Sequence, residues 1–539
     1  MCIRDRNTTE SYSGLVGSET LTLTGQGSVA SKNVSGSSQS VTLGTIALGN
    51  QSGATTSSGG LASNYNLTSA ALTINQKVLN SNSSRIYNAT TTAAASDITL
   101  TNQVSGETLQ LSNSAVTSNK NVGSYSISNL SGVTISDQAG ANASSGALAA
   151  NYTLTGGTHS FAINPKAVNI TGTRQYDGTT NIPASDISGI TGTVNTETLT
   201  MSSGLGTTSS ANVGTYNLTD TSAGTLSLAN GSNGGLAANY TLTGGTQTYT
   251  VTQRVLNSSG SKTYDANTNA LAGAITLSNL VSGEALNHSG TATTSSANAG
   301  SYTISNLSGI SIADGSGGAA SNYTLTGGTH NFTVNRRVVG VSGTRLYDAT
   351  TNAVASDLST HANLVGSETL TLSGTGTIAS KDVGSNKTVS VGTLALGNGS
   401  NGGLAGNYTL SGGTHQLTVN QRPLNATLAR QYDGTTASAG STLSSFDALQ
   451  GGETLTMTGS GTAASANVAN GIAMSSNGNL ALADGTGAAS NYSLNSTVIN
   501  IAKRVLTSSG SKTYDANTNA LAGAITLSNL VSGEALNHS

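Results

Sequence analysis

Hydrophobic and polar residues alternate along the chain in short runs, and clusters of Gly, Asn and Asp separate these runs. In residues 274–280 (AITLSNL) and 302–312 (YTISNLSGISI) the alternation has a period of two, which is typical of half-buried β-strands. Residues 323–334 (YTLTGGTHNFTV) form two shorter runs around a Gly-Gly pair. No window keeps a 3.6-residue period. The pattern therefore predicts a protein built from short strands.

A tyrosine followed by turn-forming residues recurs and marks an internal repeat. Successive copies are 89, 88, 83, 85 and 82 residues apart. After the tyrosine come Asp or Asn, which can bond the backbone two residues on, and Gly or Ala, of which Gly tolerates positive φ. We interpret the motif as a structural turn whose tyrosine ring packs into the module. The tyrosines are Tyr87, Tyr176, Tyr264, Tyr347, Tyr432 and Tyr514, and the aspartates are Asp177, Asp265, Asp348, Asp433 and Asp515.

A period of about 85 residues favours separate modules over a β-solenoid, because solenoid coils repeat every 20 to 30 residues or so. About six or seven short strands per period are enough to close a small module with its own core. We therefore expect an all-β fold: a tandem array of small two-layer β-sandwich-like modules in an elongated chain. The expected divisions are a partial repeat at 7–79, repeat 1 at 80–168, repeat 2 at 169–256, repeat 3 at 257–339, repeat 4 at 340–424, repeat 5 at 425–506 and a truncated repeat 6 at 507–539.

The two ends of the sequence differ from the rest. Residues 1–6 contain Cys2 and three charged residues, a composition that does not return, so we expect a non-native leader there. Residues 508–539 repeat residues 258–289 without a mismatch. The sequence is therefore expected to be a fragment of a longer protein.

The composition argues against several kinds of function and support. Charged residues make up only 8% of the 539 residues. The 20 basic and 23 acidic residues leave no basic field for a phosphate backbone, so no nucleic-acid partner is expected. No apolar stretch approaches the roughly 20 residues of a membrane helix, so no transmembrane segment is expected. The single cysteine excludes an intramolecular disulfide.

The few charges are placed by repeat position. A glutamate follows each motif tyrosine by 20 or 21 residues, a basic residue precedes the tyrosine by two, and an Asn-Tyr pair forms a further anchor. The charged residues are interpreted either as solvated groups that discourage edge-to-edge pairing or as an ion pair within each module, such as Lys262 with Glu284 or Arg345 with Glu368. The positions are Glu107, Glu197, Glu284, Glu368 and Glu453, with Arg174, Lys262, Arg345 and Arg430.

The sequence offers no convincing catalytic or metal site. His159, His330 and His415 recur after Thr-Gly-Gly-Thr, but the equivalent residue in repeat 2 is Gln247, which argues against a ligand or acid-base role. No His/Cys cluster has zinc spacing, no phosphate-binding loop occurs, and each candidate calcium turn holds one carboxylate. We expect no catalytic, cofactor-binding or metal-binding residues, no cofactor and no enzymatic activity.

Several coupled motifs together resemble a known family. They are Lys/Arg-x-Tyr-Asp-Gly/Ala-x-Thr, the Gly-x-Glu-x-Leu turn, Asn-Val-Gly at residues 212–214, and Asn-Tyr-x-Leu before a closing Thr-Val-Asn-x-Arg strand. This set is similar to the YDG/MBG-type repeats of large bacterial surface adhesins of the filamentous-haemagglutinin type. The match covers residues 14–539. Asn88 replaces the motif aspartate in the first copy, and Asn467-Val-Ala replaces Asn-Val-Gly in the fifth.

The resemblance implies a secreted or surface-displayed, outer-membrane-associated protein of a Gram-negative bacterium, whose secretion partner acts through regions outside this segment. The expected function is a structural and adhesive repeat region that acts as a stalk and as a multivalent surface toward a host or neighbouring-cell receptor or glycan. The alternative is an array of carbohydrate-binding, lectin-like modules. An ice-binding surface ranks lower, because a flat Thr ladder needs a Thr pair on every short rung. An enzyme ranks last.

Overall fold

The computed structural model describes residues 13–55, 58–127, 130–142, 145–219, 222–304 and 307–537. Two compact units make up this structure. The first comprises the described residues up to Arg254 together with Ser321–Tyr323, and the second comprises the other described residues from Val255 onward. The predicted leader at 1–6, with Cys2, lies outside the described residues.

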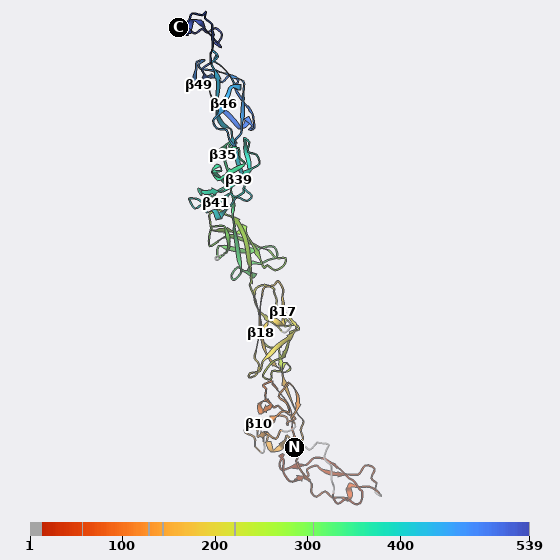
Figure 1. Cartoon of the computed structure of the whole chain (residues 1–539). Helices are drawn as coiled ribbons and strands as arrows, with labels where there is room; N and C mark the ends of the chain where they lie inside the picture. The colour runs from red at the N-terminus through yellow and green to blue at the C-terminus, as the bar shows by residue number, and fades with distance from the viewer. Residues whose placement is uncertain are drawn as a thin grey trace. The chain divides into compact units, whose positions relative to one another are not determined.

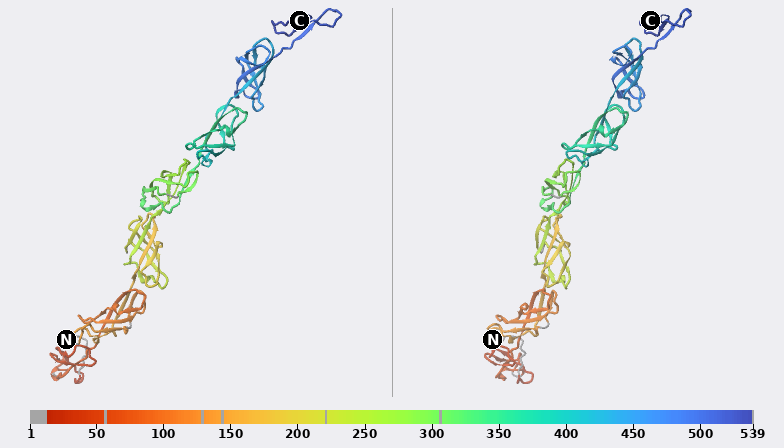
Figure 2. Two further views of the ribbon diagram at one scale, coloured as in Figure 1. Left: turned by 90° about the vertical axis from the view of Figure 1, so that its left-hand side faces the viewer. Right: turned by 60° about the vertical axis from the view of Figure 1, so that its left-hand side comes forward.

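The all-β prediction is confirmed: the described elements are short strands and three-residue 3-10 helices, in tandem repeats of about 85 residues. The strands of one repeat share a narrow range of colour and gather together in Figure 2. No helix among the described residues is long and apolar enough to cross a membrane. The helices are η1 Ala62–Asn64, η2 Ala95–Asp97, η3 Ala149–Asn151, η4 Ala184–Asp186, η5 Ala237–Asn239, η6 Ala272–Ala274, η7 Ala320–Asn322, η8 Ala355–Asp357, η9 Ala405–Asn407, η10 Gly440–Thr442, η11 Ala489–Asn491 and η12 Ala522–Ala524.

In the first unit, repeat 2 shows the architecture most simply. Its main sheet has the strand order β18-β16-β24-β21, in which the first strand, β16, and the last long strand, β24, pair in parallel. The smaller pairs β17-β20 and β19-β22 form the rest of the repeat, and Figure 1 labels β17 and β18. The strands are β16 Asn169–Gln175, β17 Asn181–Pro183, β18 Ile187–Thr191, β19 Leu199–Ser203, β20 Leu205–Thr207, β21 Gly214–Leu218, β22 Ser227–Asn230, β23 Tyr240–Thr241, β24 Gln247–Thr252 and β25 Arg254–Val255.

Repeat 1 follows the same plan, with β7 and β14 as the central parallel pair of the sheet β11-β14-β7-β9. A second sheet, β12-β10-β8, forms the other layer. The strands of the partial repeat and repeat 1 are β1 Thr22–Thr24, β2 Ser28–Val29, β3 Gln39–Thr42, β4 Ala47–Gly49, β5 Ala71–Leu72, β6 Lys77–Val78, β7 Asn80–Ile86, β8 Thr92–Ala94, β9 Leu100–Thr101, β10 Gln110–Val116, β11 Gly123–Ser126, β12 Val133–Ser136, β13 Tyr152–Thr153, β14 His159–Asn164 and β15 Lys166–Ala167.

In the second unit, repeats 3, 4 and 5 keep the central parallel pair, as β26 with β33, β35 with β43 and β44 with β51. In repeats 4 and 5 the main sheet grows to six strands, in the orders β36-β39-β40-β43-β35-β37 and β45-β48-β49-β51-β44-β46. Figure 1 labels β35 and β39, which belong to the first of these sheets.

The strands of repeat 3 are β26 Asn257–Thr263, β27 Asn269–Leu271, β28 Ile275–Ser278, β29 Leu286–Thr293, β30 Gly300–Thr303, β31 Ile310–Asp314, β32 Tyr323–Thr324, β33 His330–Asn335 and β34 Arg337–Val338. Those of repeat 4 are β35 Gly340–Leu346, β36 Asn352–Val354, β37 Thr360–Ala362, β38 Leu370–Ser373, β39 Thr375–Ile378, β40 Gly384–Ser390, β41 Ala395–Asn398, β42 Tyr408–Thr409 and β43 His415–Asn420. Repeat 5 and the segment after it hold β44 Arg422–Gln431, β45 Ala437–Ala439, β46 Leu443–Phe446, β47 Leu455–Thr458, β48 Ser460–Ala463, β49 Ala469–Ser476, β50 Ala481–Asp484, β51 Tyr492–Ala502, β52 Thr507–Gly510 and β53 Ile525–Ser528.

The cores follow from the strand alternation, because every second side chain of a strand points to the same face. In β33, for example, His330, Phe332 and Val334 are buried, while the residues between them are more exposed. The buried clusters also extend past single repeats. One cluster joins Tyr264 of repeat 3 to Leu370 and Tyr408 of repeat 4. The packing at the repeat junctions is therefore part of the core.

Candidate functional site at the repeat junctions

The junction between repeats 3 and 4 is organised around one carboxylate. The hydroxyl of Tyr264 donates to Oε1 of Glu368 at 2.7 Å, and the hydroxyl of Tyr408 donates to Oε2 at 2.6 Å. The backbone N–H of Val365 donates to the Tyr408 hydroxyl oxygen at 3.0 Å. Because that oxygen already accepts a hydrogen bond, its own hydrogen is directed to the glutamate. One tyrosine comes from repeat 3, and the other groups come from repeat 4.

The two tyrosine rings also contact each other. The rings of Tyr264 and Tyr408 meet edge to face, with centroids 5.4 Å apart and an interplanar angle of 77°. Both side chains are buried. This geometry is favourable for aromatic pairs. We call the arrangement of two tyrosines around one glutamate the Tyr-Glu-Tyr clamp.

The turn after the motif tyrosine positions that side chain. In repeat 2, Oδ1 of Asp177 accepts hydrogen bonds from the backbone N–H and the hydroxyl of Thr179, both at 2.9 Å. Gly178 has a φ of 78°, in the left-handed region that glycine adopts without strain. Ala266 takes the same place in repeat 3 with a φ of 62°. The tight turn ends the first strand of the repeat, so the tyrosine lies at the end of the repeat rather than on its face.

The Asn-Tyr pair makes a second link across the same junction. In η9, Asn407 accepts a hydrogen bond at 2.8 Å from the backbone N–H of Ala299 in repeat 3, and its Nδ2 donates to Oδ1 of Asn298 at 3.0 Å. Asn407 is buried, so both halves of its amide need partners. This helix therefore places an asparagine and a tyrosine, neighbours in the sequence, on two different contacts with the preceding repeat.

An arginine completes the junction. Arg337 donates to the backbone carbonyl of Tyr264 at 3.4 Å, and also to the backbone carbonyl and side chain of Asn363 at 2.8 and 2.7 Å. Asn363 lies in a turn with a φ of 68°. The guanidinium thus joins the end of one repeat to a loop of the next, which suits its rigid set of donors.

The same clamp recurs at two other junctions. Glu197 accepts hydrogen bonds from Tyr87 at 2.8 Å and Tyr240 at 2.5 Å, within the first unit. Glu453 accepts hydrogen bonds from Tyr347 at 2.7 Å and Tyr492 at 2.8 Å, within the second unit. The ring pairs have centroid distances of 5.4 and 5.2 Å, and the asparagine link recurs through Asn239 with Asn121 and through Asn491 with Asp382.

The junction between repeats 4 and 5 has an additional cation. Nζ of Lys381 lies 2.5 Å from Oε1 of Glu453 and 5.9 Å from the centre of the Tyr347 ring. Burial raises the pKa of Glu453, but the hydrogen bonds from Lys381, Tyr347 and Tyr492 outweigh it, so the pKa lies below its usual value. The hydrogen bond to Glu453 raises the pKa of Lys381. This clamp therefore holds an ionised pair.

Burial is the main electrostatic effect on the clamp tyrosines. Burial and the hydrogen bond to Glu368 raise the pKa of Tyr264 and of Tyr408 to about 12. Burial and the hydrogen bond to Glu197 likewise raise the pKa of Tyr87 to about 12. A phenolate beside the glutamate would place two negative charges next to each other at a largely buried ring pair, so these tyrosines stay protonated donors at neutral pH.

The structure corrects both interpretations of the repeated charges. Nη1 of Arg345 lies 2.7 Å from Oδ2 of Asp348, whereas Glu368 accepts its hydrogen bonds from Tyr264 and Tyr408, so the predicted Arg345–Glu368 ion pair is wrong. Lys262 likewise pairs with Asp265, at 2.8 Å, rather than with Glu284. The basic side chain turns back onto its own turn because the aspartate three residues later faces it.

The interpretation of these charges as solvated is also wrong where the residues are buried. Glu197 and Arg345 are only 6% and 9% exposed. The guanidinium of Arg345 also donates to the backbone carbonyl of Thr350 at 2.6 Å, which ties the turn to its strand. The further pairs of this kind are Arg174 with Asp177, Arg430 with Asp433 and Lys512 with Asp515.

Some of the remaining predicted residues make single tyrosine–tyrosine or tyrosine–glutamate contacts, and others lie in turns or at the surface. Tyr176 is buried against Tyr323 within the first unit, at a centroid distance of 5.4 Å. Tyr432 donates to Glu534, and Glu107 accepts from Tyr152. Glu284 lies in the turn after β28, where its N–H donates to the carbonyl of Val281. Tyr514 is 90% exposed.

The recurring histidines hold a hairpin together. Nε2 of His159 donates to the carbonyl of Leu154 at 2.8 Å, and Nδ1 lies 3.1 Å from the Ser81 hydroxyl. In repeat 2, Nε2 of Gln247 donates to the equivalent carbonyl, that of Leu242, at 2.7 Å. Glutamine and histidine therefore serve the same contact, which needs no proton transfer and no metal. Within the described part of the chain, no three His, Cys, Asp or Glu residues come together as a metal site.

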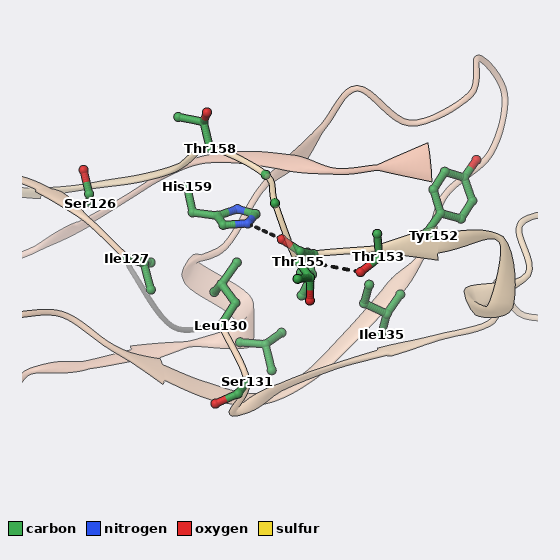
Figure 3. Close-up of a pocket in the computed structure, with 14 residues that line it drawn as sticks. Ser126, Ile127, Leu130, Ser131, Ile135, Tyr152, Thr153, Thr155, Thr158 and His159 are labelled. Atoms are coloured by element: carbon green, nitrogen blue, oxygen red, sulfur yellow. Dashed lines mark hydrogen bonds between the residues drawn. The ribbon is translucent and has the colours of Figure 1, made fainter. Parts of the chain in front are cut away.

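A cavity of about 710 Å³ opens beside His159 in repeat 1. Figure 3 shows His159, whose Nε2 donates to the Leu154 carbonyl, together with Leu130 and Ile135. Hydroxyl groups and the Gly156-Gly157 backbone line the rest of the cavity. A smaller cavity of about 270 Å³ lies at the equivalent place in repeat 4, beside Tyr408 and Leu410.

Sequence reasoning identified the motif tyrosines and the turn glutamates as repeated structural residues, but it paired the glutamates with basic residues of the same repeat. It assigned the Asn-Tyr tyrosines no role, although their repeated placement next to a buried asparagine was a usable signal. A family model described as a YDG domain matches the chain five times, at residues 70–160, 162–250, 248–330, 333–418 and 415–499. No curated protein gives a significant match.

Proposed function

This chain belongs to the YDG-domain family, and we propose that its repeats form the stalk of a large secreted or surface-displayed bacterial adhesin. The observation that carries the proposal is the recurrence of the Tyr-Glu-Tyr clamp, which joins consecutive repeats by the same buried contacts. A series of similar, well-packed junctions suits a structure that holds a distal binding region away from a cell. It does not suit an enzyme, in which one site is built once.

The arrangement of strands within a repeat also supports a stalk. The first and last long strands of a repeat run in parallel, so the chain enters at one end of the repeat and leaves at the other. Repeats of this kind add length with each copy, and their stability combines their own cores with nearest-neighbour contacts. Repeated weak contacts with a receptor would add to one another along such a stalk.

Small-angle scattering of the full chain tests the stalk. At about 30 Å per repeat, five repeats in series give a particle about 150 Å long or more. A compact particle of a 53 kDa globular protein would reject the proposal. Antibody labelling of intact cells, compared with lysed cells, tests surface display: equal labelling supports it, and labelling of lysed cells alone rejects it.

The cavity beside His159 favours a second candidate function, carbohydrate binding by the repeats. Hydroxyl groups, glycine backbone and an apolar floor face the same open space (Figure 3). Ligand sites commonly combine an apolar surface with a few polar groups. A glycan array probed with the full chain tests it. Binding that is lost when Gly157 is replaced by Leu would support a lectin role, and no binding to any glycan would leave the stalk as the function.

A further inference from the structure

Residues 508–537 repeat a sequence that has different surroundings elsewhere in the molecule. They are identical to residues 258–287 of repeat 3. Both copies begin with the same pair of strands, because β52 pairs with β53 in the antiparallel register in which β26 pairs with β28. Repeat 3 therefore shows what this sequence binds when its surroundings are complete.

In repeat 3 a parallel strand lies beside β26. β33 pairs with it from Ser258 opposite His330 to Thr263 opposite Asn335. The N–H of Ser258 donates to the carbonyl of Thr329 at 3.0 Å, and the Ser258 hydroxyl lies 3.0 Å from Nδ1 of His330. Main-chain and side-chain contacts thus fix the register of β33 on this sequence.

β33 also supplies an aromatic ring to the core. Phe332 is buried in one cluster with Tyr264 and Ile275. Its ring lies so close to Gly260 that a Cβ atom at this glycine would be 2.8 Å from Cδ2 of the ring. A glycine in a strand often marks such a close approach. The sequence shared by the two copies therefore includes the glycine that makes room for this ring.

The same sequence is open in residues 508–537. Among the described residues, β52 and β53 form a two-stranded sheet, whereas β26 and β28 belong to a four-stranded one. All four residues of β52 are exposed. Tyr514 is 90% exposed, and its counterpart Tyr264 is 3% exposed. Because the two sequences are identical, this difference comes from the neighbouring strands. An uncovered strand edge can pair with a strand of another chain.

The adjoining junction is open at the corresponding place. Tyr432 donates to Glu534, and Arg504 donates to the carbonyl of Tyr432 at 3.4 Å, as the equivalent residues do between repeats 3 and 4. Glu534 is exposed, and a cavity of about 510 Å³ lies beside it, lined also by Tyr432 and Val531. Between repeats 3 and 4 the residues equivalent to this lining pack against Tyr408. The cavity therefore corresponds to the place of the second clamp tyrosine.

In repeat 4 one continuous segment makes both kinds of contact. β42, which begins with Tyr408, pairs in parallel with β34, and the chain then continues into β43, which pairs in parallel with β35. The residues equivalent to β34 are Arg504 and Val505, and those equivalent to β35 are residues 507–513. A single extended segment can therefore reach both the cavity and the edge of β52.

We infer that residues 504–536 form an acceptor site for an extended segment of a second polypeptide with the pattern Asn-Tyr-x-Leu-Thr-Gly-Gly-Thr-His-x-Phe-x-Val-Asn. The tyrosine enters the cavity beside Glu534, the histidine lies opposite Ser508, and the phenylalanine ring covers Gly510. Strand addition of this kind gains affinity from main-chain hydrogen bonds and specificity from pockets for alternate side chains. The second polypeptide is then attached by the contacts that join consecutive repeats within the chain.

Titration of the full chain with a fluorescently labelled peptide of residues 320–335 (ASNYTLTGGTHNFTVN), followed by anisotropy, tests the inference. We expect saturable binding of one peptide per chain. A peptide with Phe332→Ala should bind at least tenfold more weakly, because it leaves the space over Gly510 empty. A peptide of the same composition in scrambled order should not bind. No saturable binding, or equal binding of the scrambled peptide, would overturn the inference.

Two substitutions in the full chain locate the bound peptide. Ser508→Pro removes the N–H whose counterpart at Ser258 donates to the parallel strand, and this N–H points away from β53, so binding should fall at least tenfold while the melting temperature stays the same. Thr507→Asn introduces the residue found in repeat 3, where Oδ1 of Asn257 accepts from the N–H of Thr329 at 2.9 Å. This variant should bind the peptide about three- to tenfold more tightly.

Sedimentation velocity of the full chain, with and without the peptide, distinguishes the proposed occupant from a second copy of the chain. We expect a monomer that binds the peptide. A dimer that the peptide does not dissociate would show that a second copy already fills the site and would overturn the inference. Binding that neither Ser508→Pro nor Thr507→Asn changes would overturn it as well, because the peptide would then lie elsewhere.

Discussion

Tyr264 donates its hydroxyl hydrogen to Glu368, a residue 104 positions later and in the following repeat, across 2.7 Å. Both side chains lie in a site that a second tyrosine, Tyr408, completes. The motif that gives the family its sequence signature is therefore a connector between repeats. Its turn shapes one repeat, and its tyrosine ring finishes the core of the next.

Removing the Tyr264 hydroxyl should weaken the coupling between repeats 3 and 4. Tyr264→Phe leaves the ring contact with Tyr408 but deprives Glu368 of one donor. We expect a loss of about 1.5 to 3 kcal/mol in the free energy of unfolding, the range for hydrogen bonds to charged groups. Urea unfolding of the full chain measures it. Tyr514→Phe is the matched control, because Tyr514 is 90% exposed, and it should cost nothing measurable.

Alkaline pH should open the clamps through their tyrosines. The pKa of Tyr264 and of Tyr408 is raised to about 12 in the folded chain, from 10.0 for an ordinary tyrosine. The protonated form is thus favoured by folding. The stability that it contributes is complete below pH 10 and is lost as the pH rises toward 12. Thermal unfolding between pH 8 and pH 12, with tyrosinate absorbance recorded in parallel, measures this. Ionisation of all tyrosines near pH 10 without unfolding would contradict it.

The turn after the motif tyrosine should favour glycine at its third position. Ala266 is exposed and has a φ of 62°, which is unfavourable for a residue with a Cβ atom. Ala266→Gly should raise the free energy of unfolding by up to about 1 kcal/mol, after the greater entropy of glycine in the unfolded chain is subtracted. The reverse change, Gly178→Ala at a φ of 78°, should lower it by a similar amount. If both substitutions changed the free energy of unfolding in the same direction, φ would not be what determines the preferred residue at this position.

His415 should be replaceable by glutamine without loss. Its Nε2 donates to the carbonyl of Leu410 at 2.8 Å, but its buried Nδ1 has no hydrogen-bond partner among the described residues. In repeat 2, Gln247 meets the equivalent carbonyl and also accepts a hydrogen bond from the backbone N–H of Ile170 at 2.9 Å. The melting temperature of His415→Gln should equal or exceed that of the native chain. His415→Leu, which removes the donor, should cost about 1 to 3 kcal/mol.

The repeated charges can be assigned to their partners by double-mutant cycles. Arg345 contacts Asp348 directly, whereas Glu368 is occupied by tyrosines. We expect a coupling energy of about 1 kcal/mol or more between Arg345→Ala and Asp348→Ala, since one partner is buried. The cycle of Arg345→Ala with Glu368→Ala should give no coupling. A coupling energy different from zero in the second cycle alone would support the ion pair between Arg345 and Glu368 instead.

The sequence was sufficient for the fold class, because strand alternation and the Gly and Asn turns are local signals. It was not sufficient for the clamp. In a periodic chain the glutamate 20 residues after Tyr264 and the glutamate 104 residues after it occupy equivalent positions, so spacing alone cannot distinguish a contact within a repeat from one to the next repeat. The turn geometry that directs the tyrosine out of its own repeat is a three-dimensional property. For the same reason the basic residues were paired with the wrong acid.

The shared cores also qualify the expectation that each module has its own core. Tyr347 of repeat 4 is buried in a cluster with Leu455 and Tyr492 of repeat 5. A fragment that begins at repeat 5 would therefore lack an aromatic ring from its core. Fragments should be cut so that they retain the preceding Tyr-Asp-Gly turn.

The parallel pairing of the first and last strands has a mechanical consequence. In repeat 2, β16 and β24 are hydrogen-bonded along their length, from Ile170 with Gln247 to Gln175 with Thr252. When the chain is pulled at both ends, these two strands are drawn past each other along their axes. The load then falls on all of their hydrogen bonds together, in shear, instead of opening them one at a time. Each repeat is thus arranged to resist tension at the ends through which its neighbours are attached.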